Sequence, residues 1–391
     1  MRLTHRWGLA PFAALIAASV AVAGCGSSSN NIGSSSSSSS PASNSAASSG
    51  VATAQKEVAS LSATTSSYPV PTASVSGVSK LKGQTVYYIP LVQQIPGFVV
   101  TAATMKVALA KAGLKLQVCN GEGQPSAVAA CVQQAVGAKA AGIVTDAIPY
   151  GMAANALNAA KAKGVPIVIA DQIAPAGTSN SNALAYVPGV VNQPSQIAWW
   201  MIANSKGKAN AIIAEEADSP SSVAYVSDSL PIYKKYCPGC TITVKTITAT
   251  TNSLLASATS SNILANPSAT YYYTEFEDSL QPTVQGIQQS GRSGMSLSVA
   301  GGSTDGLGLL KADSVVKAVV AVDQAYAGWA LTDEILRMAT KSGPVNETFP
   351  SRLFTTQNIG SIQVTPAAQA SGAWFGDSSY QTDFAQLWGV G

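Results

Sequence analysis

Apolar runs that alternate with helix-like stretches constrain the fold of this chain more than any other feature. From residue 83 onward, runs such as TVYYIPL (85–91) and PIVIAD (166–171) are separated by segments with helical patterning. Continuous apolar strands between helices indicate a parallel sheet that is covered on both faces. The expected strands are 85–91, 114–119, 141–147 and 166–171, and the expected helices between them are 99–113, 125–138 and 152–163. These elements predict a doubly wound α/β lobe.

The same alternation starts again after a connecting strand at 183–187 and predicts a second α/β lobe. The expected helices are 193–204, 221–235, 252–266, 281–290 and 326–340, and the expected strands are 209–215, 241–248, 269–275, 295–301 and 315–322. About 300 residues follow position 83, which is enough for two domains of ordinary size. Two such lobes in one chain place a cleft between them, beyond the carboxyl ends of their strands.

The first 24 residues have the pattern of a secretory signal. Arg2 and Arg6 form a basic start, and residues 7–23 form an uncharged apolar stretch that is too short for a membrane span. The run Val22-Ala23-Gly24-Cys25 resembles the bacterial lipobox, which implies cleavage before Cys25 and lipid attachment to its sulfur. The alternative is an ordinary signal peptide that contains a cysteine.

Residues 25–82 are expected to form a Ser-rich disordered tether, with a possible short helix at 51–62. A stretch of Ser, Asn, Ala and Gly buries too little apolar surface to offset its ordering entropy. No second run of 18 apolar residues occurs after the signal, so we expect no membrane-spanning helix.

Four cysteines remain besides Cys25, and an even number in an exported chain favours disulfides. Three connectivities are possible, and the local one pairs Cys119 with Cys131 and Cys237 with Cys240. The run CPGC also resembles a thioredoxin-type redox motif. That motif opens a helix after a strand, whereas this run follows an expected helix and precedes an expected strand. We therefore expect structural disulfides.

Composition excludes several classes of function. The only histidine is His5, so the exported chain lacks Ser-His-Asp and Cys-His nucleophiles and His-based metal sites. The Gly-rich runs GGSTDG and CNGEGQ lack the spacing of a phosphate loop. Without Arg2 and Arg6, 20 basic residues remain against 19 acidic ones, with no dense basic stripe. We expect no enzyme activity, no cofactor, no metal and no nucleic-acid partner.

Several ordered segments between 83 and 391 resemble the type I periplasmic binding proteins, the ribose- and galactose-binding branch of ABC importer receptors. IPLVQQIPGFVVTAATMKVALAKAGLKL resembles their opening strand, aromatic loop and first helix, and AAGIVTDA resembles the third strand with its acidic end. AKAKGVPIVIADQ resembles the strand that ends in a ligand-contacting Asp. YYYTEFEDSLQPTVQGIQQSG resembles a strand and helix of the second lobe. FAQLWGVG and the cysteines that flank NGEGQPSAVAA are typical of exported actinobacterial members.

The resemblance implies two lobes joined by three crossovers, near residues 188, 322 and 357. The implied division is 83–188 plus 323–356 for lobe 1 and 189–322 plus 357–391 for lobe 2. The implied protein is a monomeric, lipid-anchored, extracytoplasmic receptor that closes around one small molecule and delivers it to an ABC permease. One alternative is a receptor of the same fold that senses a cationic or other non-sugar ligand for a signalling partner. Another is a tethered hydrolase with a carboxylate pair.

The resemblance also implies which residues contact the ligand. Asp171 and Asp146 end the fourth and third strands, where a carboxylate can accept two hydroxyl hydrogen bonds; Asp171 could instead cap a turn. Phe98 could stack on a sugar ring or pack in the core. The further candidates in the first lobe are Gln93, Gln94, Gln172 and Tyr150, of which Tyr150 could instead cap its loop. The other candidates, each of which could instead be a solvated loop residue, are Glu216, Asp218, Ser219, Phe276, Glu277, Asp305, Asp323 and Gln324.

The chain departs from that family in its arginines. Sugar-binding relatives often carry an arginine beside the fourth-strand Asp, where this chain has Gln172. Only Arg292, Arg337 and Arg352 remain after the signal. We therefore expect a cleft without arginine and a neutral polyol or a cation as ligand, because phosphate, sulfate and carboxylate ligands favour arginine.

Overall fold

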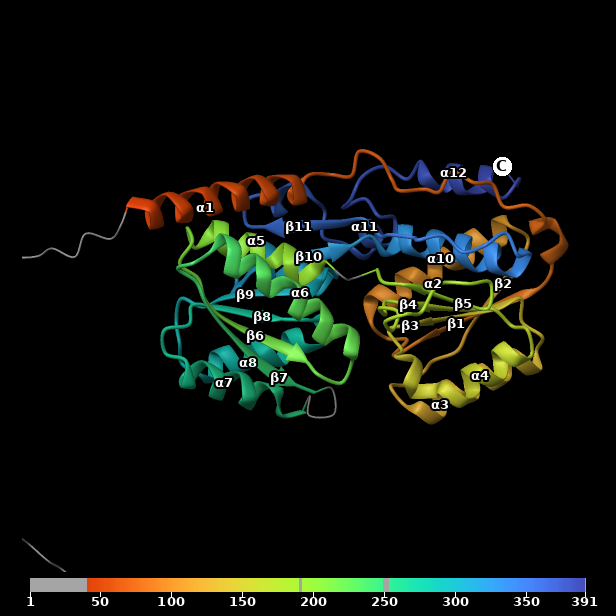
Figure 1. Ribbon diagram of the computed structural model, residues 1–391, viewed down its shortest axis with the longest axis horizontal. Helices are drawn as coiled ribbons and strands as arrows, with labels where there is room; N and C mark the ends of the chain where they lie inside the picture. The colour runs from red at the N-terminus through yellow and green to blue at the C-terminus, as the bar shows by residue number, and fades with distance from the viewer. Residues whose placement is uncertain (1–40, 190–191, 249–252, 391) are drawn as a thin grey trace, which may run out of the picture. The chain divides into compact units, whose positions relative to one another are not determined.

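Two β-sheets, each with helices on both faces, organise the protein (Figure 1). The computed structural model describes residues 41–189, 192–248 and 253–390, and it describes side chains from residue 48. Within these residues the first sheet has the strand order β2-β1-β3-β4-β5, with all neighbours parallel. The second sheet has the order β11-β10-β9-β8-β6-β7. The predicted α/β class is confirmed, but the second sheet is mixed because β11 runs antiparallel to β10.

The first lobe is built on the five-stranded sheet. Its strands are β1 (Thr85–Pro90), β2 (Lys115–Val118), β3 (Gly142–Asp146), β4 (Ile167–Ala170) and β5 (Leu184–Val187). Its helices are η1 (Val78–Leu81), α2 (Pro96–Lys111), α3 (Pro125–Gly137), η2 (Tyr150–Ala153) and α4 (Ala154–Ala162).

The second lobe is built on the six-stranded sheet. Its strands are β6 (Asn210–Glu216), β7 (Thr241–Ile247), β8 (Tyr271–Thr274), β9 (Ser296–Gly301), β10 (Val316–Val322) and β11 (Ser351–Thr355). Its helices are α5 (Gln193–Asn204), α6 (Pro220–Tyr236), α7 (Leu255–Ala265), η4 (Glu277–Ser279), α8 (Leu280–Gln289), α9 (Thr304–Lys311) and η5 (Ile359–Ser361). The remaining helices are α1 (Pro41–Ser62), α10 (Gln324–Thr340), α11 (Pro366–Ala370) and α12 (Tyr380–Leu387).

Local sequence explains where these elements start and how they pack. Proline opens α2, α3 and α6, at positions where a helix does not use the backbone N–H that proline lacks. Strands β3 and β4 are buried at every position, as expected for strands covered on both faces. Helices α2 and α10 pack on one face of the first sheet, and α3 and α4 pack on the other. The second sheet is covered by α7, α8 and α9 on one face and by α1, α5 and α6 on the other.

The C-terminal part of the chain passes between the lobes differently from the expected division. Strand β11 pairs with β10 in the second sheet, although it was expected in the first lobe. Helix α12 was expected in the second lobe, but Tyr380, Phe384 and Trp388 belong to the core between α2, α10 and the first sheet. Burial of these three aromatic rings beside Trp329 of α10 explains that position.

The described N-terminal residues are packed on the body of the protein rather than forming a free tether. Helix α1 begins at Pro41, ten residues before the expected helix, and packs on α5, α6 and β11 with Ala54 fully buried. The chain then continues to the first lobe, where Val75 and Val78 enter the core. We call residues 41–82 the N-terminal strap. The signal and Cys25 lie outside the described residues.

Hydrogen bonds and ring contacts hold the strap beside the connections between the lobes. Arg352 Nε donates to Ser62 O at 2.9 Å, and Arg337 Nη2 donates to Ala73 O at 2.6 Å. The Tyr68 ring stacks on Tyr326 with centroids 5.1 Å apart. Within residues 41–390, apart from the two undescribed internal gaps, no helix has the length and apolar character that a membrane span needs.

Candidate functional site

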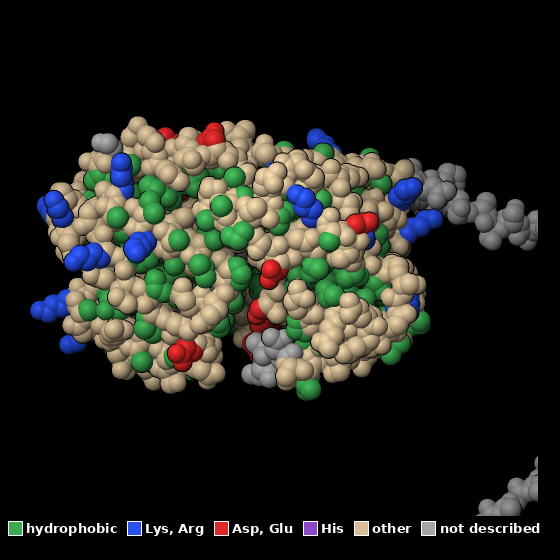
Figure 2. All heavy atoms as spheres, turned by 180° about the vertical axis from the view of Figure 1, so that it is seen from behind, with side chains coloured by type: hydrophobic (Ala, Val, Ile, Leu, Met, Phe, Trp, Pro, Cys, Tyr) green, Lys and Arg blue, Asp and Glu red, His purple; other side chains and the backbone are tan. Residues whose placement is uncertain are grey.

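A cleft of about 450 Å³ lies between the two lobes. Its lining residues follow the carboxyl ends of strands in both sheets: Ala147 after β3, Asp171 after β4, Glu216 at the end of β6, Phe276 after β8 and Gly301 at the end of β9. Ligands of open α/β sheets bind at this edge. Acidic side chains gather along the furrow between the two halves of the molecule, while the Lys and Arg side chains visible on that face lie away from it (Figure 2).

Two carboxyl groups meet at the first-lobe end of the cleft. Asp171 lines it and is only 8 % exposed, whereas Asp146 lies behind it and is 2 % exposed. The two side chains are within hydrogen-bonding reach of each other, and Tyr88 OH donates to Asp146 Oδ2 at 2.6 Å. Burial raises the pKa of both carboxyl groups, and the negative charge of Asp146 raises the pKa of Asp171 further. Burial and their proximity therefore disfavour ionisation of both groups at once.

The backbone at Asp171 has a left-handed conformation, with φ of 55°. A non-glycine residue seldom adopts this conformation, and such residues cluster at functional sites. Here the conformation places the Asp171 carbonyl where it accepts hydrogen bonds from Gln172 Nε2 at 2.9 Å and from Tyr225 OH at 3.2 Å. Tyr225 belongs to α6, so this turn of the first lobe is bonded directly to the second lobe.

Gln172 provides further contact between the lobes. Its Oε1 accepts a hydrogen bond from Ser221 Oγ at 3.0 Å, and Ser219 Oγ lies 3.4 Å away from the same atom. The Ile173 N–H donates to Ser221 Oγ at 3.0 Å. The residue after Asp171 is thus an amide that bonds the start of α6.

The second lobe supplies an acidic wall. The pKa of Glu216 is raised to about 7, first by burial and then by the negative charges of Asp278 and Asp218. Behind it, Glu275 accepts a hydrogen bond from the Glu216 N–H at 2.9 Å, and burial raises its pKa to about 9. Both carboxylate oxygens of Glu277 lie 2.8 Å from the Ser303 nitrogen, whose N–H they accept, but burial still raises the pKa of Glu277 to about 7.

The described residues that line the cleft include no basic side chain beside this wall. The described lining contains Asp171, Glu216, Asp218, Glu277 and Asp278 but no Lys, Arg or His. The internal residues outside the described part, 190–191 and 249–252, are Val, Ala, Thr and Asn and carry no charge.

Arg292, Arg337 and Arg352 are bonded elsewhere. Arg292 Nη2 donates to Ala269 O, and the other two bond the N-terminal strap. Arg337 also pairs with Asp333 in α10, so none of the three guanidinium groups is among the lining residues.

The first lobe contributes a mostly apolar wall. Leu91, Val92, Ile95, Phe98 and Met152 line the cleft there. Phe98 lies in the first turn of α2 and is 8 % exposed, so most of its ring is in contact with protein. Phe276 and Tyr225 add two aromatic side chains from the second lobe.

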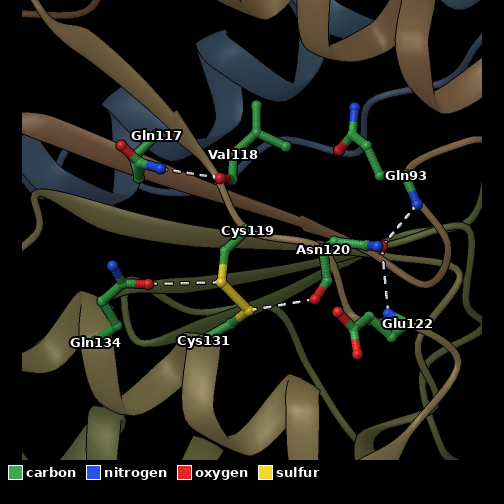
Figure 3. The surroundings of a disulfide bond; sticks show 8 residues. All are labelled: Gln93, Gln117, Val118, Cys119, Asn120, Glu122, Cys131 and Gln134. Carbon is green, nitrogen blue, oxygen red and sulfur yellow. Dashed lines mark hydrogen bonds between the residues drawn. A yellow bond between two sulfur atoms is a disulfide. The ribbon is translucent and has the colours of Figure 1, made fainter.

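A disulfide fixes one edge of the cleft (Figure 3). Cys119, just after β2, is bonded to Cys131 in α3, and the loop between them contributes Gly123 and Gln124 to the lining. Within that loop, Asn120 Oδ1 accepts hydrogen bonds from the Gln93 N–H at 2.8 Å and the Glu122 N–H at 3.2 Å. Both predicted disulfide pairs are confirmed, the second being Cys237–Cys240 between α6 and β7.

Nine of the predicted contact residues line the cleft. They are Phe98, Asp171, Gln172, Glu216, Asp218, Ser219, Phe276, Glu277 and Gln324.

Six others lie outside the lining. Asp146 is behind Asp171, and Gln93 and Gln94 lie in the loop before α2, where only Gln94 is exposed. Tyr150 OH instead donates to Asn158 Oδ1 at 2.6 Å. The last two, Asp305 and Asp323, have local roles in helix starts.

These two aspartates look like cleft residues in the sequence because each follows a strand. Asp305 is exposed in the first turn of α9, where its N–H donates to Ser303 Oγ at 3.0 Å. Asp323 is fully buried and caps α10, accepting hydrogen bonds from the Tyr326 N–H at 3.0 Å and from Tyr68 OH at 3.1 Å. An N-cap satisfies a helix N–H that would otherwise lack an acceptor.

Several lining residues were not predicted. Ser222 and Tyr225 face the cleft from the first two turns of α6, and Gln124, Gln193, Asp278, Ser303 and Gln369 also line it. Ser222 and Tyr225 are three positions apart in the helix that follows β6, so they lie on the same helix face. This spacing is a sequence signal that could have identified these two residues. The described residues contain no group of three or more His, Cys, Asp or Glu that could hold a metal ion.

Two α/β lobes with a ligand-sized cleft at the carboxyl ends of their strands define the type I periplasmic binding fold, and solved structures share it. A 5-methylthioribose transporter solute binding protein from Thermotoga lettingae TMO is 14 % identical with a TM-score of 0.66, over 79 % of this chain and 99 % of that one. A sugar ABC transporter protein from Yersinia enterocolitica is 19 % identical with a TM-score of 0.64, over 81 % and 98 %. GanP, a glucose-galactose binding protein from Geobacillus stearothermophilus, is 14 % identical with a TM-score of 0.63, over 71 % and 99 %. No protein-family model and no curated protein sequence matches the chain.

Proposed function

We propose that this protein is an extracytoplasmic solute receptor that captures a small, sugar-sized ligand between its lobes and delivers it to an ABC permease. The cleft of about 450 Å³, lined from both lobes by hydrogen-bonding and aromatic side chains, carries the proposal. The solved structures with the same fold include a transporter solute binding protein, a sugar ABC transporter protein and a glucose-galactose binding protein, which supports it. Binding is non-covalent, and the receptor acts without a cofactor.

Ligand capture works by a shift between open and closed arrangements of the lobes. A ligand that contacts both lobes favours the closed form by its differential affinity. Gln172 and Tyr225 support this mechanism, because their hydrogen bonds join the lobes directly at the cleft. Lipid attachment at Cys25 would hold the receptor at the outer face of the membrane, beside the permease.

Thermal unfolding and titration calorimetry with sugars, polyols, nucleosides, amines and amino acids test this function. A true ligand at 100 times its Kd stabilises the protein by about 2.7 kcal/mol. Small-angle scattering of the same samples should show a more compact particle with ligand. The variant Asp305→Asn, in an exposed helix start outside the lining, should bind like the original protein. Absence of stabilisation by every compound class would contradict the proposed function.

A further inference from the structure

We propose that the ligand is a small organic cation, an amine-bearing sugar or polyol whose ammonium group binds the acidic wall formed by Glu216, Asp218 and Asp278. This inference rests on the proposed function and specifies the chemical class of its ligand. The cleft between the lobes is the independent indication that a ligand binds, and the charges of its lining indicate what that ligand carries.

The distribution of charge in the cleft is one-sided. Four of the five lining carboxyl groups, those of Glu216, Asp218, Glu277 and Asp278, belong to the second lobe, whereas the first lobe contributes Asp171 and an apolar wall. Glu216 and Glu277 are half-buried, whereas Asp218 and Asp278 are exposed, so water screens part of the repulsion among these like charges. A neutral sugar would donate hydroxyl hydrogen bonds to these groups but would leave their mutual repulsion in place.

Glu216 lines the cleft without a protein group, among the described residues, that stabilises the negative charge of its carboxylate. Within residues 41–390, leaving aside the undescribed gaps, no ion pair or donated hydrogen bond to its carboxylate is present, and the nearby charges of Asp278 and Asp218 only raise its pKa. Glu277, by contrast, accepts the Ser303 N–H. A half-buried carboxylate without a protein donor depends on water for its hydrogen bonds, and an ammonium group that displaces this water supplies both a donor and the opposite charge.

The geometry favours an extended organic cation over a metal ion. The described carboxyl groups do not converge in a cluster of three that could coordinate a metal. The opposite wall, with Phe98, Ile95 and Met152, fits the apolar face of a carbon skeleton rather than the hydration shell of an ion. Between the two walls, Gln124, Gln172 and Ser222 offer amide and hydroxyl groups for the hydroxyls of the same molecule.

Titration calorimetry with matched pairs of compounds tests the inference on the full exported chain. The probes are 1-amino-1-deoxysorbitol against sorbitol, and glucosamine and galactosamine against their parent sugars and their N-acetyl derivatives. The amine in a pair that binds should bind at least about tenfold more tightly than its neutral partner, as expected when a close charge pair is gained. Glu216→Gln should abolish this preference, while Asp305→Asn, an acidic residue outside the lining, should retain it.

The pH dependence gives a second readout that a merely structural role of Glu216 would not produce. The acidic groups that face Glu216 are Asp218, Glu275 and Asp278, and the negative charges of Asp278 and Asp218 add to the effect of burial on its pKa. With a pKa of about 7, Glu216 must lose its proton to pair with an alkylammonium that stays charged through pH 8. Affinity for 1-amino-1-deoxysorbitol should therefore rise about tenfold from pH 6 to pH 8.

The outcomes separate the two proposals. A neutral partner that binds as tightly as its amine, or an amine whose affinity is unchanged in Glu216→Gln, overturns the cationic ligand and leaves the solute receptor intact. Failure of every pair, together with failure of the wider panel of sugars, polyols, nucleosides and amino acids, overturns the receptor function itself.

Discussion

Replacement of Trp388 by alanine is expected to destabilise the first lobe severely, although this residue lies only three positions before the end of the chain. The indole is 3 % exposed and stacks on Trp329 with centroids 5.6 Å apart and planes 9° from parallel. It also packs on Phe384 at 5.9 Å. Its Nε1–H donates to Asp333 Oδ1 at 2.6 Å, and Asp333 is fully buried in α10.

Two losses add up in this variant. Removal of a buried tryptophan side chain costs about 3–5 kcal/mol from lost burial and the cavity that remains. A buried acceptor left without its donor costs about 1–3 kcal/mol more. Trp388→Ala should therefore lower the free energy of unfolding by about 4–8 kcal/mol, a large share of the roughly 5–15 kcal/mol of a typical domain.

Urea unfolding followed by far-ultraviolet circular dichroism measures this change without relying on the removed fluorophore. Trp388→Phe provides the matched control, because it keeps an aromatic ring against Trp329 but lacks the N–H, and it should lose only about 1–3 kcal/mol. A loss below about 1 kcal/mol in the alanine variant, or equal losses in both variants, would refute the argument that α12 is an integral part of the first-lobe core.

Three further predictions concern other parts of the structure. Burial raises the pKa of Glu347 to about 10 in the folded protein. The stability that its protonated form contributes is therefore complete below the unfolded pKa near 4.5 and is lost as the pH rises toward 10. Glu347→Gln should reduce the decline of the unfolding free energy between pH 6 and pH 9 by about 1.4 kcal/mol per pH unit. Replacement of both Cys119 and Cys131 by serine should cost about 3 kcal/mol in urea unfolding under oxidising conditions. Gly302→Ala should lower the melting temperature far more than Gly291→Ala, since both have positive φ but only a Cβ at 302 would overlap strand β10.

Each of these predictions has an outcome that contradicts it. An unchanged pH slope in Glu347→Gln would show that this carboxyl group is ionised in the folded protein. Equal stability of the double serine variant and the original protein would show that the disulfide does not restrict the unfolded chain. Similar melting temperatures for the two alanine variants would show that the backbone at Gly302 moves without cost.

The sequence predicts the central architecture well because that part depends on local patterns. Strands such as β3 and β4 are uninterrupted apolar runs, and Gly113 and Gly164 adopt positive φ just after α2 and α4, where helices commonly end. No comparable sequence pattern indicates which strand β11 pairs with. Its antiparallel pairing with β10 depends on an edge that only the folded sheet provides.

Tertiary context also decides the parts that the sequence misassigned. The start of α1 is rich in Ser and Ala and reads as a tether, yet the helix is stabilised by Ala54 and its neighbours against α5. In the cleft, an acidic residue after a strand is the same sequence signal for Asp171, Asp305 and Asp323. Only the fold distinguishes the residue that lines the cleft from the two at helix starts.

The N-terminal strap has a practical consequence for anyone who shortens this chain. A recombinant version begun at residue 83, where the strand pattern starts, would leave the guanidinium groups of Arg352 and Arg337 without the carbonyls of Ser62 and Ala73. Both arginines are at least nine-tenths buried, so each would face an interior with one acceptor fewer. The stretch that looks most dispensable in the sequence is therefore a structural part of the folded protein, and truncations should end before Pro41.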